Sequence, residues 1–251
     1  MERITSRQNP LAVRIRKLNT SRAFRRQTGE FTGEGPKLLA EAVKAGADLR
    51  AVIAEEGSSF LPPLSGVRTV EVSSELLCSL CDTKTPQGVL FLCANPLLEP
   101  PERLTGHRYI VLDGVQDPGN VGTIWRTADA LGADGLILVN GCADPFSPKT
   151  VRATMGACFR LPICETDENG LMQLLAQSEI PLFATALGGD TEDLRKADLT
   201  RAAVLIGSEG RGISDGLLRL SDRCLKIPMR DRCESLNAAA AAAVILWEMA
   251  R

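Results

Sequence analysis

Short apolar runs separated by helical patterns constrain the fold of residues 109–251 more than any other feature of the sequence. The five runs lie at residues 109–112, 135–139, 182–186, 203–206 and 224–227. Each is mostly apolar, which is typical of strands that are buried on both faces of a parallel sheet. Helical spacing returns between and after them, at residues 121–131, 148–155, 171–177, 215–220 and 235–250. Strands that alternate with helices predict an α/β fold whose ligand site lies at the carboxyl ends of the strands.

The first hundred residues predict a second, smaller α/β unit. Its expected helices lie at residues 10–26, 36–45 and 75–81, and its expected strands lie at residues 49–54 and 88–94. The proline-rich stretch of residues 95–107 then has the composition of a linker. We therefore predict an amino-terminal domain of residues 1–96, a linker of residues 97–107 and a carboxyl-terminal domain of residues 108–251.

The composition excludes several classes of protein. With 44% hydrophobic and 24% charged residues, the chain is globular rather than disordered or collagen-like. The longest apolar run, Ala238–Trp247, has ten residues, whereas a membrane-spanning helix needs about twenty. The first ten residues are charged and contain no apolar signal segment. We therefore expect a cytoplasmic protein without a membrane span, whose eight cysteines are thiols.

The sequence predicts no metal site. Cys78 and Cys81 form a single C-x-x-C pair, whereas a zinc site requires further ligands at matching spacing. His107 is the only histidine, which excludes a histidine-based triad and a site with several histidine ligands. Structural thiols and a surface histidine are the simpler interpretations.

A basic segment at the amino terminus contrasts with the net charge of −2. Residues 1–26 contain eight Lys or Arg side chains and one acid, a net charge of +7, which leaves −9 for the rest of the chain. Contacts from Lys and Arg to phosphate supply much of the affinity of proteins for nucleic acid. A solvated helix face explains the same charges equally well. The candidate RNA contacts in this segment are Arg14, Arg16, Lys17, Arg25 and Arg26.

Three strand-to-loop junctions combine glycine with polar side chains. At the first, glycines flank Asn120 at the start of a predicted helix, where backbone N–H groups can meet an anion. At the second, the glycines of residues 205–214 surround Glu209, and glycine lets a backbone approach a ligand closely. At the third, Ser235 and Asn237 open the final helix.

Each junction also has a simpler explanation. A glycine-rich turn needs no ligand, and Ser235 or Asn237 can serve as a helix N-cap. Arg126, on the helix after the first junction, has the position of an ordinary solvated side chain. The dinucleotide-binding pattern G-x-G-x-x-G is absent there, which argues against a nicotinamide or flavin enzyme.

Together, the three junctions resemble the motifs of the RNA ribose 2′-O-methyltransferases of the SpoU/TrmH branch of the SPOUT superfamily. The first motif is matched by Asn120, Gly122 and Arg126, and the second by Gly207, Glu209 and Gly212. The third motif is matched by Ile227, Pro228, Met229, Ser235, Leu236 and Asn237. The first hundred residues resemble the L30e-like RNA-binding extension that is common in this family, through the segments SRQNPLAVRIRKL and EFTGEGPKLLAEAVKAG.

The resemblance implies S-adenosylmethionine as methyl donor and an RNA ribose 2′-hydroxyl as acceptor. It also implies a central role for Arg126, which the family sometimes uses as a base. Because a guanidinium ordinarily stays protonated, we favour stabilisation of the developing alkoxide and the neighbouring phosphate, with a base of perturbed pKa as the alternative. The polar residues implied to orient Arg126 and the ribose are Asn120, Glu209, Ser235 and Asn237. The implied cofactor contacts are Gly207, Ile227 and Leu236, together with Met229, Ala184 and Thr185.

The resemblance further implies a carboxyl-terminal trefoil knot and a homodimer with the site near the interface, an arrangement that would allow Arg126 to act in its own subunit or across subunits. We expect a ribosomal RNA substrate, from the large subunit because the L30e-like extension is commoner among such enzymes, and a tRNA substrate is the alternative. Asp231 stands where the family usually has glycine. That departure leaves a non-catalytic RNA-binding relative as a further alternative.

Overall fold

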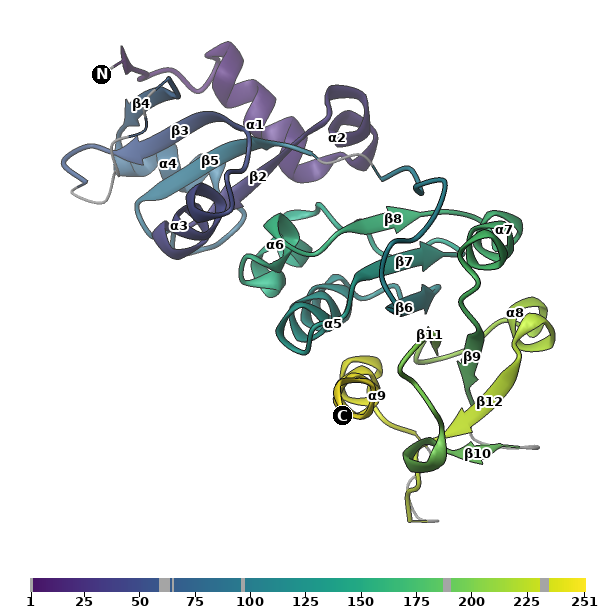
Figure 1. Cartoon of the computed structure of the whole chain (residues 1–251). Helices are drawn as coiled ribbons and strands as arrows, with labels where there is room; N and C mark the ends of the chain where they lie inside the picture. The colour runs from purple at the N-terminus through teal and green to yellow at the C-terminus, as the bar shows by residue number, and fades with distance from the viewer. Residues whose placement is uncertain (1, 59–63, 65, 96–97, 187–190, 231–234) are drawn as a thin grey trace. The chain divides into compact units, whose positions relative to one another are not determined.

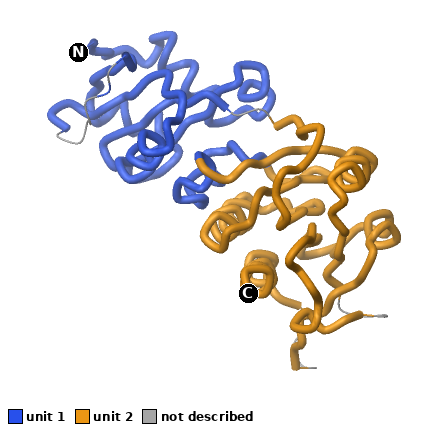
Figure 2. The backbone as a smooth tube through the Cα atoms, in the orientation of Figure 1, with its two compact units in different colours: residues 1–97, 144–159 blue, residues 98–143, 160–251 orange. Residues whose placement is uncertain are grey.

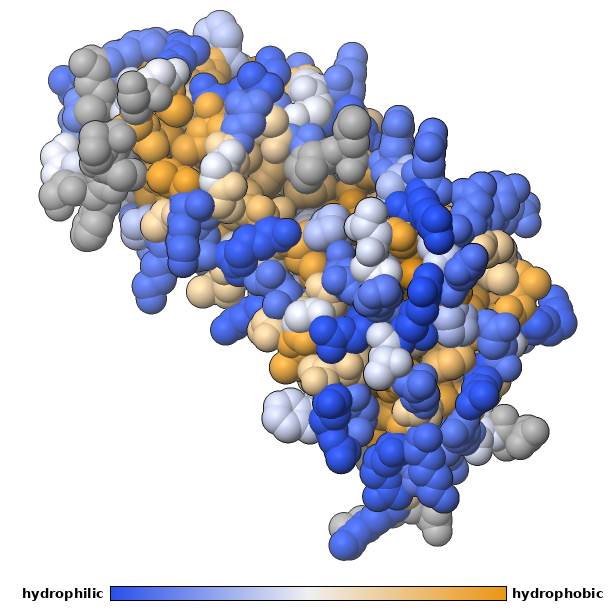
Figure 3. All heavy atoms as spheres, viewed as in Figure 1, coloured by the Kyte–Doolittle hydropathy of each residue, from blue (hydrophilic) through white to orange (hydrophobic). Residues whose placement is uncertain are grey.

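The chain divides by its internal contacts into two compact units (Figure 2). A computed structural model describes all residues except 1, 59–63, 65, 96–97, 187–190 and 231–234 (Figure 1). Unit 1 contains residues 1–97 and 144–159, and unit 2 contains residues 98–143 and 160–251. Hydrophilic side chains cover much of the face that Figure 3 shows, and the predicted apolar strands lie inside.

Unit 1 is built on a five-stranded sheet with the strand order β1-β4-β3-β5-β2. The strands are β1 Glu2–Arg3, β2 Glu30–Glu34, β3 Leu49–Glu55, β4 Arg68–Val72 and β5 Val89–Ala94. β5 runs antiparallel to β2 and β3, whereas β4 runs parallel to β1 and β3. The helices are α1 Pro10–Thr20, α2 Arg22–Thr28, α3 Pro36–Lys44, α4 Ser74–Leu80 and α6 Pro148–Thr154.

The single helix predicted over residues 10–26 is two helices. The break lies at Ser21, whose backbone is extended and whose Oγ accepts a hydrogen bond from the Phe24 N–H at 3.2 Å. A serine at this position caps the second helix instead of continuing the first. The strands β2 and β4 were not predicted, because their polar residues and the glycine in β2 weaken the strand pattern.

Residues 144–159 pack in unit 1 by their contacts, although they lie within the predicted carboxyl-terminal domain. The ring of Phe146 lies 4.9 Å from that of Phe31, measured between centroids. Arg25 is only 5% exposed and donates two hydrogen bonds to Asp144 Oδ2, from Nε at 2.9 Å and from Nη2 at 2.6 Å. The sequence pattern assigned this segment to the carboxyl-terminal domain because it follows a strand of that domain, whereas its side chains are buried in the other unit.

Unit 2 is built on a seven-stranded sheet in which all neighbouring strands are parallel, in the order β10-β12-β9-β11-β6-β7-β8. The strands are β6 Arg108–Asp113, β7 Gly135–Val139, β8 Ile163–Glu165, β9 Leu182–Thr185, β10 Glu192–Asp193, β11 Ala202–Gly207 and β12 Arg223–Lys226. The predicted α/β fold with a parallel sheet is confirmed, and each of the five predicted strands is present. The additional strands β8 and β10 have only three and two residues, too few for a periodic signal.

Helices cover both faces of this sheet. They are α5 Pro118–Ala130, α7 Glu168–Ser178, α8 Asp215–Leu220 and α9 Ala238–Ala250. Leucines of α7 and α8 pack in one cluster with β6, β9 and β11, while α5 packs against α9. Part of the predicted linker belongs to the same core, because Leu104 is buried and its N–H donates to Ser178 Oγ at 2.9 Å.

Candidate functional site

The glycine-rich loop after β11 folds back on itself. β11 ends at Gly207, directly beside Asp113 at the end of β6. Ser208 and Gly212 exchange two backbone hydrogen bonds of 3.0 and 2.9 Å, which closes a tight turn around Glu209. A Cβ on Gly207 would lie 2.2 Å from the carbonyl carbon of Gly212, so the turn requires glycine at this position.

Three polar side chains from distant parts of the sequence meet beside this loop. Asn120, in the first turn of α5, donates its amide to Glu209 Oε1. The Asn237 amide donates to the same Oε1 at 3.3 Å and to Asn120 Oδ1 at 3.2 Å. We call Asn120, Glu209 and Asn237 the polar cluster. It places three of the residues singled out in the sequence in direct contact.

Asn237 both caps α9 and belongs to the polar cluster. Its Oδ1 caps α9 by accepting hydrogen bonds from the N–H groups of Ala239 and Ala240, at 3.0 and 3.3 Å. Its amide meanwhile points to the polar cluster. Capping fixes the orientation of the side chain, and that orientation presents the amide donor to Glu209.

A cavity of about 350 Å³ lies at the carboxyl ends of β9, β11 and β12. Its lining residues include Thr185, Gly207, Glu209, Ile227, Met229, Ser235 and Leu236, all of which the sequence singled out. Ala184 does not line this cavity, because it is completely buried within β9. The remaining wall is largely apolar, with Ile206, Ile213, Leu218 and Leu225.

The cavity has the character of a site for a nucleoside-type cofactor. Its volume lies at the lower end of the range for small-molecule sites, which combine apolar walls with a few polar groups. The walls suit an adenine ring, and the backbone groups of the loop at residues 207–212 suit its polar edge. Within that loop, a Cβ on Gly210 or Gly212 would meet no atom within 4 Å, so space is open on that side.

A polar network around the buried Asp113, which sequence reasoning missed, supports the far end of the glycine-rich loop. Asp113, 4% exposed, accepts a hydrogen bond at Oδ2 from the Ser214 N–H at 2.6 Å. Asn140 donates to Asp113 Oδ1 at 2.7 Å and to Glu168 Oε1 at 2.9 Å, from a left-handed backbone with φ of 53°. A polar residue at the end of an apolar strand, as Asp113 and Asn140 both are, was the available signal.

Arg126 lies outside this arrangement. Its side chain is exposed on α5 and does not line the cavity. It makes no hydrogen bond or ion pair with another residue in the part of the chain that the structure describes. Asp231, the departure from the family pattern, falls outside the described residues.

The basic amino-terminal residues are partly committed to contacts within unit 1. The buried Arg25 is paired with Asp144 and is therefore not available to RNA in this structure, which corrects its assignment. Arg14 pairs with Glu30 at 2.7 Å, and Lys17 lies 5.6 Å from the centre of the Phe24 ring. Arg16 donates to the carbonyl of Arg7, and Arg26 is exposed at the end of α2.

Burial raises the pKa of several thiols and keeps them protonated. The pKa is raised to about 12 for Cys81 and Cys93 and to about 11 for Cys142 and Cys164, with desolvation as the largest cause. No group of three or more His, Cys, Asp or Glu side chains with the arrangement of a metal site occurs among the described residues. In the same part of the chain, no helix is long and apolar enough to cross a membrane.

Comparison with known protein families shows to which family the chain belongs. Residues 107–247 match the SpoU rRNA Methylase family. The chain belongs to this family. Residues 2–90 of this SpoU family protein match the MRM3-like substrate binding domain.

Relatives of this SpoU family protein span its whole length. It is 31% identical to the Bacillus subtilis 23S rRNA (guanosine(2553)-2'-O)-methyltransferase RlmP, over 99% of each chain. It is 33% identical to the Streptomyces viridochromogenes 23S rRNA (uridine(2479)-2'-O)-methyltransferase, over 99% of this chain and 92% of the relative. The AdoMet-bound rRNA methyltransferase from Sinorhizobium meliloti superposes with a TM-score of 0.86 at 32% identity, over 99% of this chain and 97% of that one.

Proposed function

We propose that this protein transfers a methyl group from S-adenosylmethionine to a ribose 2′-hydroxyl of large-subunit ribosomal RNA. The observation that carries the proposal is the polar cluster of Asn120, Glu209 and Asn237 beside an apolar cavity with a glycine-rich wall. The names of the relatives support the rRNA substrate and the 2′-O position. An rRNA substrate also agrees with the cytoplasmic location expected from the sequence.

The cofactor is proposed to lie in the cavity at the ends of β9, β11 and β12. The backbone groups of Gly207, Ile227 and Leu236 would contact its adenosine part, and Thr185 and Met229 would complete the wall, since all five line the cavity. When bound, S-adenosylmethionine supplies an electrophilic methyl group on a sulfonium. The carboxyl-terminal segment that forms this wall is also the segment that we propose to be threaded in the trefoil knot.

The chain's own residues activate a weak nucleophile. A neutral ribose hydroxyl must lose its proton as it attacks, so groups that stabilise the developing negative charge lower the barrier. We assign that stabilisation to the guanidinium of Arg126, which also contacts the adjoining phosphate. The polar cluster and Ser235 orient the ribose, because Glu209 accepts and the two asparagine amides donate hydrogen bonds at fixed positions.

A homodimer explains why Arg126 lies outside the cavity. α9 exposes the apolar side chains of Val244 and Trp247, at 40% and 61% exposure, on a helix that packs beside α5. Such apolar exposure is the property of a subunit interface. We propose that two copies associate through this region and that Arg126 of one subunit acts at the cavity of the other.

Transfer of a labelled methyl group to transcribed 23S rRNA tests the reaction. The expected product is a single 2′-O-methylated ribose, and transcribed tRNA serves as the alternative substrate. Methylation of tRNA but not of 23S rRNA would refute the substrate assignment. Absence of S-adenosylmethionine binding at millimolar concentration would refute the enzyme and favour a non-catalytic RNA-binding relative.

Mixed dimers test the assignment of Arg126 to the partner's site. Arg126→Ala and Asn237→Ala are each expected to be inactive alone. If Arg126 acts across subunits, a random mixture contains half mixed dimers with one intact site each, and recovers about 25% of wild-type activity. No recovery in a mixture that has exchanged subunits would refute action across the dimer.

A further inference from the structure

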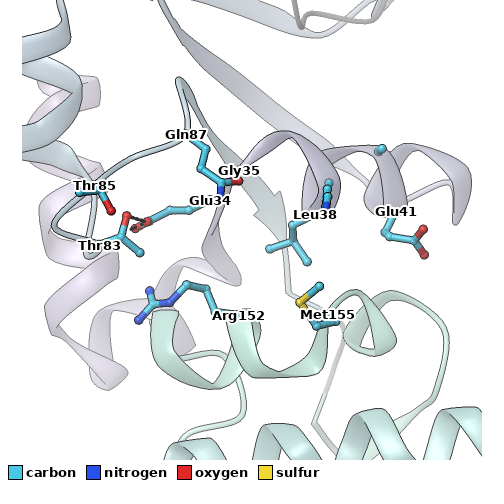
Figure 4. Close-up of a pocket in the computed structure, with 11 residues that line it drawn as sticks. Glu34, Gly35, Leu38, Glu41, Thr83, Thr85, Gln87, Arg152 and Met155 are labelled. Atoms are coloured by element: carbon cyan, nitrogen blue, oxygen red, sulfur yellow. Dashed lines mark hydrogen bonds between the residues drawn. The ribbon is translucent and has the colours of Figure 1, made fainter.

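Unit 1 contains a cavity of about 680 Å³ that is separate from the motif residues (Figure 4). One wall is α3 with the residue before it, the second is the loop before β5, and the third is α6. In Figure 4, Arg152 on α6 and Met155, the residue after α6, face Glu34 and Leu38 across the cavity. The side chains that the argument uses are Glu34, Lys37, Leu38, Gln87, Arg152 and Met155.

Hydrogen bonds hold the walls of this cavity in place. Glu34 accepts hydrogen bonds from the Asp82 N–H at 2.5 Å and from the Thr83 hydroxyl at 2.7 Å. Arg152 pairs with the Asp82 carboxylate at 2.8 Å, which ties α6 to the same loop. These contacts between its walls therefore fix the shape of the cavity.

The acidic side chains of the lining are already occupied. Glu34 is bound by the loop, and Glu41 also has a partner within the chain. Lys37, by contrast, is exposed and has no hydrogen bond or ion pair with any residue that the structure describes. The ammonium group of Lys37 is therefore available to bind an anionic ligand at this cavity.

Met155, at the cavity wall, has an unusual backbone conformation and an exposed apolar side chain. Its φ of 49° is left-handed, a conformation that L residues other than glycine, asparagine and aspartate rarely adopt. Its side chain is also 49% exposed although it is large and apolar. Met155 is the C-cap of α6, which accounts for its backbone conformation, and its half-exposed side chain at the cavity wall offers an apolar contact to a ligand. A flexible thioether packs well against a flat aromatic ring.

We propose that this cavity receives one unstacked nucleotide of the RNA substrate. The base lies between Met155 and Leu38, the Gln87 carboxamide hydrogen-bonds its edge, and Lys37 contacts a neighbouring phosphate. Sequence-specific RNA recognition uses bases that are splayed out of a helix and packed on protein side chains. The match of residues 2–90 to a substrate binding domain supports RNA as the ligand, and the inference rests on the proposed function in that respect.

Arg152 and Met155 lie outside residues 2–90, within the stretch that matches the methylase family. The nucleotide site therefore needs residues from both matched stretches of the chain. A fragment that ends at residue 97 would lack the third wall of the cavity.

The test is the affinity of the full-length protein for transcribed 23S rRNA, measured by filter binding. Met155→Gly removes the thioether side chain but suits the left-handed backbone, so we expect an unchanged or higher melting temperature and a Kd raised about five- to tenfold. Val43→Ala is the matched control, because Val43 is an exposed apolar residue of α3 that does not line the cavity. An unchanged Kd for Met155→Gly would overturn the proposal.

A second pair of variants covers the case in which Met155→Gly loses stability. Lys37→Gln is expected to raise the Kd for 23S rRNA about threefold or more and to flatten its salt dependence, whereas Lys44→Gln on the same helix leaves both unchanged. Equal effects of the two lysine variants would refute a specific contact. Photo-crosslinking with 4-thiouridine-substituted 23S rRNA should label peptides that contain Met155 or Gln87, and labelling elsewhere only would also refute it.

These measurements separate the nucleotide site from the proposed reaction. The Kd of each variant for S-adenosylmethionine should equal that of the wild type, because the cofactor cavity lies in unit 2. If the wild type binds 23S rRNA without methylating it, the proposed reaction fails while the Kd values still decide the nucleotide site. If the wild type binds no 23S rRNA, the nucleotide site is overturned as well.

Discussion

Replacing Gly207 by alanine should weaken cofactor binding with little effect on the rest of the fold. The added Cβ would lie 2.2 Å from the carbonyl carbon of Gly212, 2.4 Å from its oxygen and 2.4 Å from the Ile213 nitrogen. All three are backbone atoms, so no side-chain rotation can relieve the contact. The turn between Ser208 and Gly212 must open, and that turn is a wall of the cofactor cavity.

The magnitude follows from the cost of overpacking. Forcing an extra methyl group into a closely packed site costs about 1–3 kcal/mol. If this cost falls on the conformation that binds the cofactor, the Kd for S-adenosylmethionine rises about five- to 150-fold, since 1.4 kcal/mol is a factor of ten. Isothermal titration calorimetry measures the Kd, and thermal unfolding measures the effect on stability.

Gly210→Ala in the same loop is the matched control. A Cβ on Gly210 would meet no atom within 4 Å, so the Kd for S-adenosylmethionine should stay within about twofold of wild type. A wild-type Kd for both the Gly207 and Gly210 variants would refute the assignment of the cavity to the cofactor. Equal weakening by both would refute the argument from the Gly212 contact.

Three further predictions address the site and the stability of the chain. Arg126→Ala should lower kcat for methyl transfer at least a hundredfold and leave the Kd for S-adenosylmethionine nearly unchanged; equal kcat values would refute the assigned role. Arg25→Ala should lower the free energy of unfolding in urea by about 3–5 kcal/mol, because it leaves the Asp144 carboxylate buried without its partner, whereas Arg7→Ala at the exposed pair with Glu75 should cost less than about 1 kcal/mol. Similar losses in those two variants would contradict the structural role of Arg25. The raised pKa values of four thiols should make their contribution to the free energy of unfolding constant well below pH 9 and progressively lost between pH 9 and 12, because the unfolded chain ionises its thiols first; an unchanged free energy of unfolding from pH 9 to pH 11 would contradict their burial. These thiols are Cys81, Cys93, Cys142 and Cys164.

The sequence locates a candidate site residue best where that residue sits at the end of a strand or the start of a helix. Gly207 ends β11, and Asn237 caps α9. Parallel strands bring their carboxyl ends to one edge of the sheet, so such residues gather there without further information. Ala184 failed this rule because its position one residue before the end of β9 buries it in the sheet.

The sequence by itself determined the α/β character of the chain, since apolar runs and helical spacing are local patterns that direct burial whichever way the elements connect. Only the tertiary structure decided which side chains meet. Arg25 and Asp144 are separated by 119 residues, and Asn120 and Asn237 by 117. Contacts between residues so far apart in sequence require the intervening chain to form a closed loop. The free energy of such a contact depends on the packing of the whole core and not on the local sequence around either residue. For that reason the sequence offers Arg25 as a candidate RNA contact, whereas folding places it in a buried ion pair with Asp144.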